Sequence, residues 1–177
     1  MKPAAVEGHV AEGRRNVSWM ARRLSGQRRW SRPALCLAVL TLSACALPRW
    51  PVDARLTSGF GLRFNGMRPD LHRGVDLDVP IGTPVTAMAG GTVRFAGVQR
   101  GFGNVVWIDH IAGFATAYAH LSHIAVGQGD RVSAGQPVGL SGASGNVTGP
   151  HLHFEVWRWG RPVDPIPVLG GKPDAHR

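Results

Sequence analysis

Residues 91–120 read GTVRFAGVQRGFGNVVWIDHIAGFATAYAH and contain three short runs rich in β-branched and aromatic residues. The runs cover 91–98, 104–110 and 114–120, and glycine-containing turns at 101–103 and 112–113 separate them. Short runs between such turns are typical of β-strands joined by tight connections. This stretch therefore predicts three β-strands and no helix.

The same pattern continues through the rest of the chain from Leu56 onward, where no 11-residue helical period occurs. Six further strands are expected, at 56–60, 74–78, 84–87, 130–132, 137–141 and 151–158. Nine strands at this spacing predict an all-β domain, either an antiparallel barrel or a sandwich-like fold. A proline-bounded segment from Pro162 to Pro167 is expected to pack across its end.

The composition limits the classes of protein that the chain can represent. With 177 residues and 44% apolar residues, it can build one domain with a real core, and it is not a disordered chain. Its two cysteines cannot form a disulfide scaffold or a four-cysteine zinc site. The 24 glycines and 13 prolines favour tight turns over long helices.

The net charge of +9 is concentrated at the N-terminus. Residues 1–44 hold eight basic and two acidic residues, whereas the remaining 133 hold twelve and nine. A nucleic-acid-binding domain would carry its excess charge on the folded part. The distribution therefore indicates a protein that does not bind nucleic acid.

The N-terminal segment has the features of an export signal. A basic stretch leads into an apolar run at 34–42, which is far shorter than the roughly 20 residues needed to cross a bilayer. Leu42-Ser-Ala-Cys45 then resembles a bacterial lipobox, in which the cysteine is acylated and becomes the new N-terminus. A short buried helix and cleavage without lipidation are the alternatives.

These features predict four segments. Residues 1–44 are a leader and lipoprotein signal peptide, with Met20 as an alternative start, and 45–55 are a short tether. Residues 56–169 are the folded domain and 170–177 a frayed tail. The tether, at most about 35 Å long, keeps the domain near its membrane. Because no acidic residue follows Cys45 directly, resemblance to known sorting patterns favours the outer membrane.

Two histidines, His151 and His153, are placed two apart in a predicted strand, so they share one face about 6–7 Å apart. One imidazole can then bind a metal while the other reaches a bound water. The alternative is a pair of hydrogen-bonded histidines on a polar sheet face. Glu155 lies on the same face, either orienting an imidazole or as a surface carboxylate.

His72 and Asp76 form a second pair, with Gly74 between them allowing close approach of the backbone. Two histidines and one aspartate from the two pairs match a catalytic zinc site, which has three protein ligands and one open position. A mononuclear iron site accepts the same set and is the minor alternative.

The other histidines are interpreted by their positions. His120 ends a predicted strand, where it is expected to share a face with Tyr118 while Ala117 and Ala119 pack inward. His110 is expected to make a structural hydrogen bond, and His123 to lie in an exposed turn.

Taken in order, the segments from about Thr57 to Leu169 resemble the lysostaphin-like (LytM-type) zinc endopeptidases of bacterial cell walls. Each segment alone is unspecific, but the ordered set is specific. The segments are SGFGLR (58–63), HRGVDLD (72–78), GTPVTA (82–87), GGTV (90–93), GNVV (103–106), YAHLS (118–122), GQPVG (135–139) and GPHLHFE (149–155).

The resemblance implies roles for five residues: zinc ligands His72, Asp76 and His153, and catalytic histidines His120 and His151. It implies one zinc ion and hydrolysis of the peptide stems or crosslinks of peptidoglycan by a zinc-activated water. Together with the lipobox, it implies an exported lipoprotein facing the periplasm. A D-Ala to diaminopimelate crosslink is the expected target there, and a cell-wall amidase or regulatory protein is a candidate partner.

Two rival functions share parts of this pattern. Some relatives have lost ligands and act only as activators of cell-wall amidases, but all five positions are filled here. A biotinyl or lipoyl carrier requires a lysine in a hairpin, and the only lysines are Lys2 and Lys172. The glycine-rich stretch 141–149 lacks the lysine of a phosphate-binding loop and is expected to form a groove wall.

Overall fold

A computed structural model describes residues 47–65 and 67–171 of the chain. The predicted leader at 1–44, the lipidation site Cys45 and the end of the predicted frayed tail lie outside the described residues. Within the described ranges, no helix is long and apolar enough to cross a membrane.

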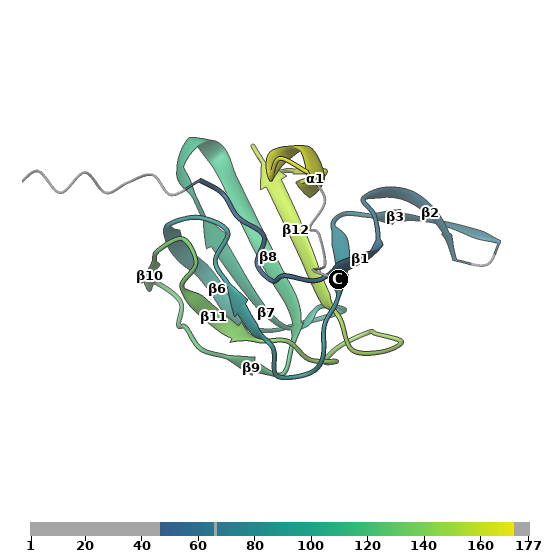
Figure 1. Ribbon diagram of the computed structural model, residues 1–177, viewed down its shortest axis with the longest axis horizontal. Helices are drawn as coiled ribbons and strands as arrows, with labels where there is room; N and C mark the ends of the chain where they lie inside the picture. Colours follow the sequence, from purple (N-terminus) through teal and green to yellow (C-terminus); the bar gives the residue numbers. More distant parts are fainter. Residues whose placement is uncertain (1–46, 66, 172–177) are drawn as a thin grey trace, which may run out of the picture. The chain divides into compact units, whose positions relative to one another are not determined.

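One large antiparallel sheet dominates the described part of the chain (Figure 1). Every adjacent pair of strands in it is antiparallel, and β13 (Arg161–Val163) pairs with β12 beside the main path. The strand order is β1 (Arg55–Ser58), β4 (Val75–Asp78), β12 (Leu152–Arg158), β8 (Phe114–Leu121), β7 (Gly103–Asp109), β6 (Gly91–Gln99) and β10 (Arg131–Val132).

A smaller sheet covers one face of the large one. It consists of β5 (Pro84–Thr86), β11 (Pro137–Leu140) and β9 (His123–Ile124). Fully buried Val85 and Val138 from this sheet join Tyr118 and Phe154 of the large sheet in one hydrophobic core. The all-β antiparallel prediction is therefore confirmed. In the described residues the large sheet ends at β1 and β10 without closing, so the fold is sandwich-like and not a barrel.

All nine predicted strands are present, with ends that differ by no more than two residues. The sequence analysis missed the hairpin of β2 (Gly61–Asn65) and β3 (Arg68–His72), which extends beside β1 in Figure 1. It also missed β9 and β13. The segment predicted as a tail from Pro162 to Pro167 instead continues β13 and begins the short helix α1 (Pro165–Val168). Asp164 caps this helix by accepting a hydrogen bond from the Ile166 N–H.

The prediction for the two faces of β8 was right in that Ala117 and Ala119 are buried, but it was wrong about the face that points into the main core. Tyr118 points into the main core, where its hydroxyl accepts from the Met88 N–H at 2.8 Å. Ala117 and Ala119 lie on the opposite face, in a smaller apolar cluster with Trp107. The small alanines leave room for the rings of Trp107 and Trp157, whose centroids lie 5.8 Å apart. Strand alternation fixes which face each residue takes, but the sequence alone did not show which face is the core.

Candidate metal and catalytic site

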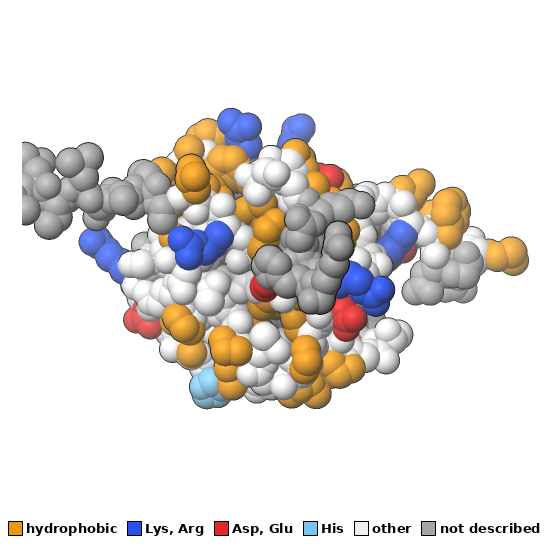
Figure 2. All heavy atoms as spheres, in the orientation of Figure 1, with side chains coloured by type: hydrophobic (Ala, Val, Ile, Leu, Met, Phe, Trp, Pro, Cys, Tyr) orange, Lys and Arg blue, Asp and Glu red, His pale blue; other side chains and the backbone are white. Residues whose placement is uncertain are grey.

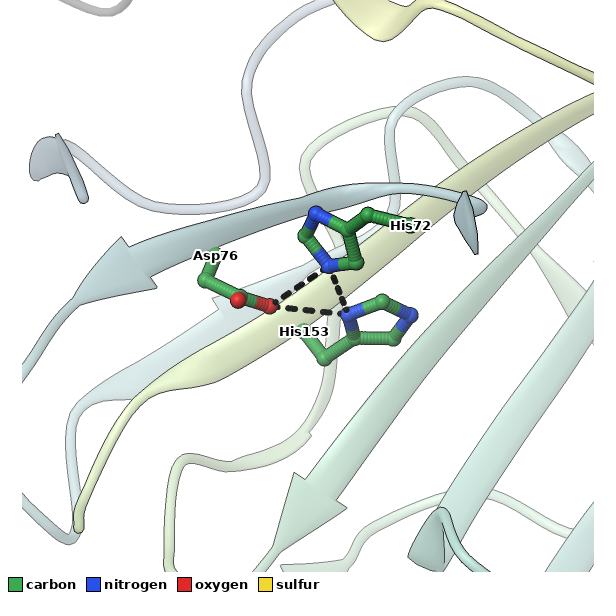
Figure 3. Close-up of side chains that lie close together, drawn as sticks. All are labelled: His72, Asp76 and His153. Carbon is green, nitrogen blue, oxygen red and sulfur yellow. Dashed lines mark hydrogen bonds and ion pairs between the residues drawn. The ribbon is translucent and has the colours of Figure 1, made fainter. Parts of the chain in front are cut away.

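Three potential metal ligands converge where β3, β4 and β12 meet (Figure 3). His72 is the last residue of β3, and the register places His153 on β12 directly opposite Asp76 on β4. Asp76 Oδ1 lies 2.8 Å from His153 Nδ1 and 3.2 Å from His72 Nε2. The two ring nitrogens are 3.1 Å apart, and all three ligand atoms lie within 4.8 Å of one another.

Gly74 makes this convergence possible. A Cβ atom at this position would overlap the carbonyl oxygen of Phe154 and the side chain of Glu155 on β12. The chain between His72 and Asp76 therefore passes against β12 at a separation that no side chain permits. The close approach expected at Gly74 is confirmed.

The outer nitrogen of each imidazole is held by an acceptor. His72 Nδ1–H donates to the Gly59 carbonyl at 2.6 Å, which leaves Nε2 as the lone-pair nitrogen facing Asp76. His153 Nε2 lies 3.0 Å from Glu155 Oε1, which leaves Nδ1 facing the same point. Such partners fix the tautomer and ring orientation of a metal-binding histidine.

Glu155 is a buried carboxylate with only 1% of its surface exposed. Besides the contact with His153, its Oε2 accepts from Trp157 Nε1 at 2.6 Å. Of the two alternatives for this residue, the structure shows the one in which it orients an imidazole.

Arg63 on β2 is a further site residue. It belongs to the segment 58–63 of the family resemblance, but no role was predicted for it. Its Nη1 lies 3.3 Å from Asp76 Oδ2, and its Nε donates to Asp70 Oδ2 at 2.9 Å. The guanidinium therefore holds the Asp76 oxygen that faces away from the two imidazoles. The β2–β3 hairpin is fixed to the site through this side chain.

The charges of the site favour an ionised Asp76 beside a protonated His153. Burial would raise the pKa of Asp76, but its contacts with the His153 and His72 rings, above all the hydrogen bond from His153, outweigh burial and hold this pKa far below its usual range. Burial would lower the pKa of His153, but the carboxylates of Asp76 and Glu155 raise it to about 9. A metal cation and the His153 proton would therefore compete for the same lone pair.

His120 and His151 lie beside this cluster. Their ring centroids are 4.8 Å apart, and the ring of His120 is 5.8 Å from that of His153. His151 Nε2 lies 3.8 Å from Asp76 Oδ1. His120 Nδ1–H donates to the Ser144 carbonyl and His151 Nδ1–H to the Gly149 carbonyl, each at 2.9 Å. Both rings therefore keep Nε2 as the nitrogen free to accept a proton.

His120 has a backbone conformation that is uncommon for a residue other than glycine, with φ at +62°. This conformation turns the His120 ring away from the face that strand alternation in β8 would give it. His120 therefore does not share the face of Tyr118, which contradicts the prediction. A hydrogen bond from its N–H to the Phe102 carbonyl at 2.9 Å holds this conformation. Burial lowers the pKa of His120 to about 4, outweighing the Ser144 carbonyl that raises it.

An open groove of about 800 Å³ contains all five predicted residues. Asn146, Val147 and Thr148 line part of it, which confirms the groove wall expected from the glycine-rich stretch. His110 and His123 are not part of this lining. His110 bonds the Gly90 carbonyl and the Thr116 hydroxyl, as expected, and His123 is exposed, although on β9 and not in a turn.

The family model described as "Peptidase family M23" matches residues 70–165, the segment that carries all five of these side chains. The chain belongs to peptidase family M23.

Among its relatives is the peptidoglycan DD-endopeptidase ShyA of Vibrio cholerae, 44% identical over 124 residues. This match covers 67% of the chain and 29% of ShyA, so the chain spans about a third of the length of such curated relatives.

Two solved peptidase structures have a similar fold. A zinc-containing peptidase from Vibrio cholerae superposes with a TM-score of 0.64 at 39% identity, over 70% of this chain and 39% of that one. The catalytic domain of lysostaphin from Staphylococcus simulans gives 0.62 at 36% identity, over 67% of this chain and 93% of that one. The lysostaphin-type fold predicted from the ordered segments is confirmed.

Proposed function

We propose that this chain is a zinc-dependent endopeptidase that hydrolyses the peptide crosslinks or stems of peptidoglycan. The observation that carries the proposal is the arrangement of five side chains in one groove. Three potential ligand atoms of His72, Asp76 and His153 converge, and the imidazoles of His120 and His151 lie beside them with Nε2 left free.

The donor set fits zinc. Two imidazole nitrogens and one carboxylate oxygen, without a fourth protein ligand, match the sites in which zinc is catalytic. When bound, zinc supplies a Lewis acid and makes a water molecule acidic enough to attack at neutral pH. His72, Asp76 and His153 would hold it, with Glu155 and Gly59 orienting the imidazoles and Arg63 the carboxylate.

His120 and His151 would move the protons of the reaction. Each uses its Nδ1–H on a fixed carbonyl and offers Nε2 as an acceptor. One imidazole takes a proton from the attacking water, and the other donates to the developing oxyanion or the leaving amine.

The groove and the relatives support a peptidoglycan substrate. An open channel walled by backbone-rich loops suits an extended peptide, which can bind through main-chain hydrogen bonds. The relative ShyA is named as a peptidoglycan DD-endopeptidase, so a DD-crosslink is the bond we assign. Reaching it requires export, for which we propose lipidation at Cys45 and attachment to the outer membrane on the periplasmic side.

The proposal is tested by digesting purified sacculi with the zinc-loaded chain, with and without a chelator, and by mass spectrometry of the released muropeptides. Chelator-sensitive loss of crosslinked dimers is expected. His153→Ala and Asp76→Ala should lose zinc and activity together, whereas His120→Ala should keep zinc and lose at least 100-fold in turnover. Loss of zinc in His120→Ala would show that the ligand assignment is wrong.

A non-catalytic activator of cell-wall amidases is the alternative with the same fold. A fully zinc-loaded chain that releases no product from sacculi, but accelerates a purified amidase, would establish it. The complete set of five side chains favours the enzyme.

A further inference from the structure

The end of the large sheet farthest from the metal site is a row of arginines and exposed apolar residues. The register places Arg161 opposite Arg158, and Arg158 opposite Phe114, across β13, β12 and β8. At the same end of β7, β6 and β10, Asp109 lies opposite Thr92, and Thr92 opposite Arg131. We call this the turn end, since it carries the β7–β8 and β12–β13 turns.

The turn end holds the charge excess of the described chain. Residues 47–171 contain ten arginines and eight acidic residues. Five of these arginines belong to the turn end, with three acidic residues on or next to the same strands, and the remaining charges balance. The arginines are Arg49, Arg94, Arg131, Arg158 and Arg161; the acidic residues are Asp109, Asp130 and Asp164. Blue side chains stand along the upper margin of Figure 2, above the ends of β8 and β12.

Apolar side chains stand among these arginines. Trp159 in the β12–β13 turn is 72% exposed and Ile111 in the β7–β8 turn is 77% exposed. Trp159 has φ at +51°, in a two-residue turn where asparagine, aspartate or glycine is favoured. Its N–H bonds the Gly113 carbonyl at 2.9 Å, and its ring packs on Gly113 where a Cβ would overlap it. The structure therefore holds a tryptophan in solvent at a conformational cost.

The N-terminal part of the chain enters the domain at this same end. The Arg49 N–H bonds the Met88 carbonyl, two residues before Gly90, and Gly91 pairs with β10. Leu47, the first described residue, is 84% exposed. The predicted lipid attachment site, Cys45, precedes Leu47 by two residues. A lipid at this position would bring the turn end close to the membrane surface.

We propose that the turn end rests on an anionic phospholipid surface, with Trp159 and Ile111 at the interface and the arginines on the headgroups. Arginine with tryptophan is the combination that suits this interface, because one side chain binds phosphate and the other tolerates a half-apolar layer. The opening of the groove then faces away from the membrane. His120 lies six positions after Phe114 along β8, so the site stands about 20 Å above the surface.

This proposal does not depend on the catalytic function, and its test reads orientation directly. The full chain is prepared with Cys36 and Cys45 replaced by serine, and one new cysteine carries a polarity-sensitive nitrobenzoxadiazole dye. In one protein the label replaces Ile111, and in the control it replaces Met67, which is 98% exposed on the β2–β3 hairpin. Vesicles contain either phosphatidylcholine alone or phosphatidylcholine with about 30% phosphatidylglycerol, so that about one lipid in three is anionic.

We expect a blue shift at position 111 with anionic vesicles only, and none at position 67. The double variant Arg158→Glu/Arg161→Glu should weaken vesicle binding about tenfold or more. Arg55→Glu/Arg100→Glu, which changes the net charge equally at exposed positions elsewhere, should keep most of the binding. The basic leader is common to all these proteins, so it cannot create the difference.

Three results would overturn the proposal. The first is a dye at position 111 that stays in a water-like environment when the protein is bound to vesicles. The second is an equal blue shift at positions 111 and 67. The third is an equal loss of vesicle binding in the two double variants. Binding of a soluble polyanion with the same affinity as the vesicles, and without a shift at 111, would identify a general anion-binding surface instead. Unchanged thermal melting of each variant establishes that the fold is intact.

Discussion

His153 shows how the local contacts of one residue prepare a site. Its two ring nitrogens face two carboxylates, Asp76 and Glu155, at 2.8 and 3.0 Å. Without a cation between them, the ring is held as an imidazolium, and the pKa is raised to about 9. A metal that replaces this proton keeps the Glu155 contact, because only Nδ1 must change its partner.

Replacement of Glu155 by glutamine tests this arrangement. The carboxylate accepts two hydrogen bonds, from the rings of His153 and Trp157, whereas an amide has only one oxygen for two donors. We expect zinc affinity to fall about 10–100-fold in Glu155→Gln, as measured by competition with a chelator of known affinity. Asp109→Asn makes the same chemical change at a surface ion pair with Arg94 and should leave the affinity unchanged. Equal affinities in all three proteins would contradict the role assigned to Glu155.

The five candidate residues could be named from the sequence because they fall in short motifs whose order is specific. Their partners could not. The carbonyls that accept from the imidazoles belong to Gly59, Ser144 and Gly149. Because every residue has a backbone carbonyl, the sequence does not show which ones accept these hydrogen bonds. Arg63 was within a quoted motif, but its contact with Asp76 depends on the β2–β3 hairpin, which was not predicted.

At the level of elements, the close packing of the chain before β4 against β12 requires that Gly74 has no side chain. We expect Gly74→Ala to destabilise the fold by about 2 kcal/mol or more, because its Cβ would overlap the β12 backbone. Gly59→Ala is the matched control, since nothing lies within 4 Å of a Cβ there. Urea unfolding of the zinc-free proteins measures both, and a Gly74→Ala protein as stable as Gly59→Ala would refute the close approach.

A partly buried hydrogen-bond chain connects β8 to the neighbouring turns. His110 Nδ1–H donates to the Gly90 carbonyl, and His110 Nε2 lies 2.8 Å from Thr116 Oγ1. The Thr116 and Tyr118 hydroxyls are 3.0 Å apart, and the Met88 N–H donates to Tyr118. With His110 neutral, each hydroxyl hydrogen has an acceptor. With His110 protonated, the hydrogen of the fully buried Tyr118 hydroxyl would have none among these groups.

This chain predicts the pH dependence of stability. Burial lowers the pKa of His110, although the Gly90 carbonyl acts to raise it. The unfolded chain therefore takes up this proton first as the pH falls. The stability that His110 contributes is present above about pH 6.5 and is lost as the pH falls through the folded-state pKa.

Urea unfolding of the wild type and His110→Gln between pH 5 and 8 measures this contribution (a range of about 1.5 units on either side of the ordinary histidine value). The difference between the two proteins should shrink toward low pH. His123→Gln, at an exposed position on β9, should keep the wild-type dependence. A difference that stays constant or grows as the pH falls would contradict the assigned protonation state.

The strands were predictable because each is a short β-branched run between glycine turns, and this signal is local. The β2–β3 hairpin lacked it, since RPDLH in β3 carries a proline and two charged residues. Which face of β8 points into the main core also depends on long-range packing. The core lies on the side of the small second sheet, whose pairing is not encoded within any one strand.

For the molecule as a whole, metal binding should raise the stability of the folded state. No unfolded chain presents His72, Asp76 and His153 together, so zinc binds the native state selectively. At a free zinc concentration 100-fold above the dissociation constant, the gain is about 2.7 kcal/mol. A chelator should therefore lower the melting temperature by about 10 °C. In His72→Ala, the melting temperature should not respond to zinc or chelator, and a response like that of the wild type would exclude this cluster as the site.

The distance along the chain between the converging residues also has a consequence for when the protein becomes active. His72 and His153 are 81 positions apart, and Asp76 meets His153 only after β12 has inserted between β4 and β8. Such non-local pairings form late in folding, because a long loop must close first. A chain still emerging from a ribosome or a translocation channel therefore lacks a complete metal site until nearly all of its domain has passed through. On the function proposed above, the enzyme would be inactive during its own synthesis and transport, and the folding of β12 would complete its site.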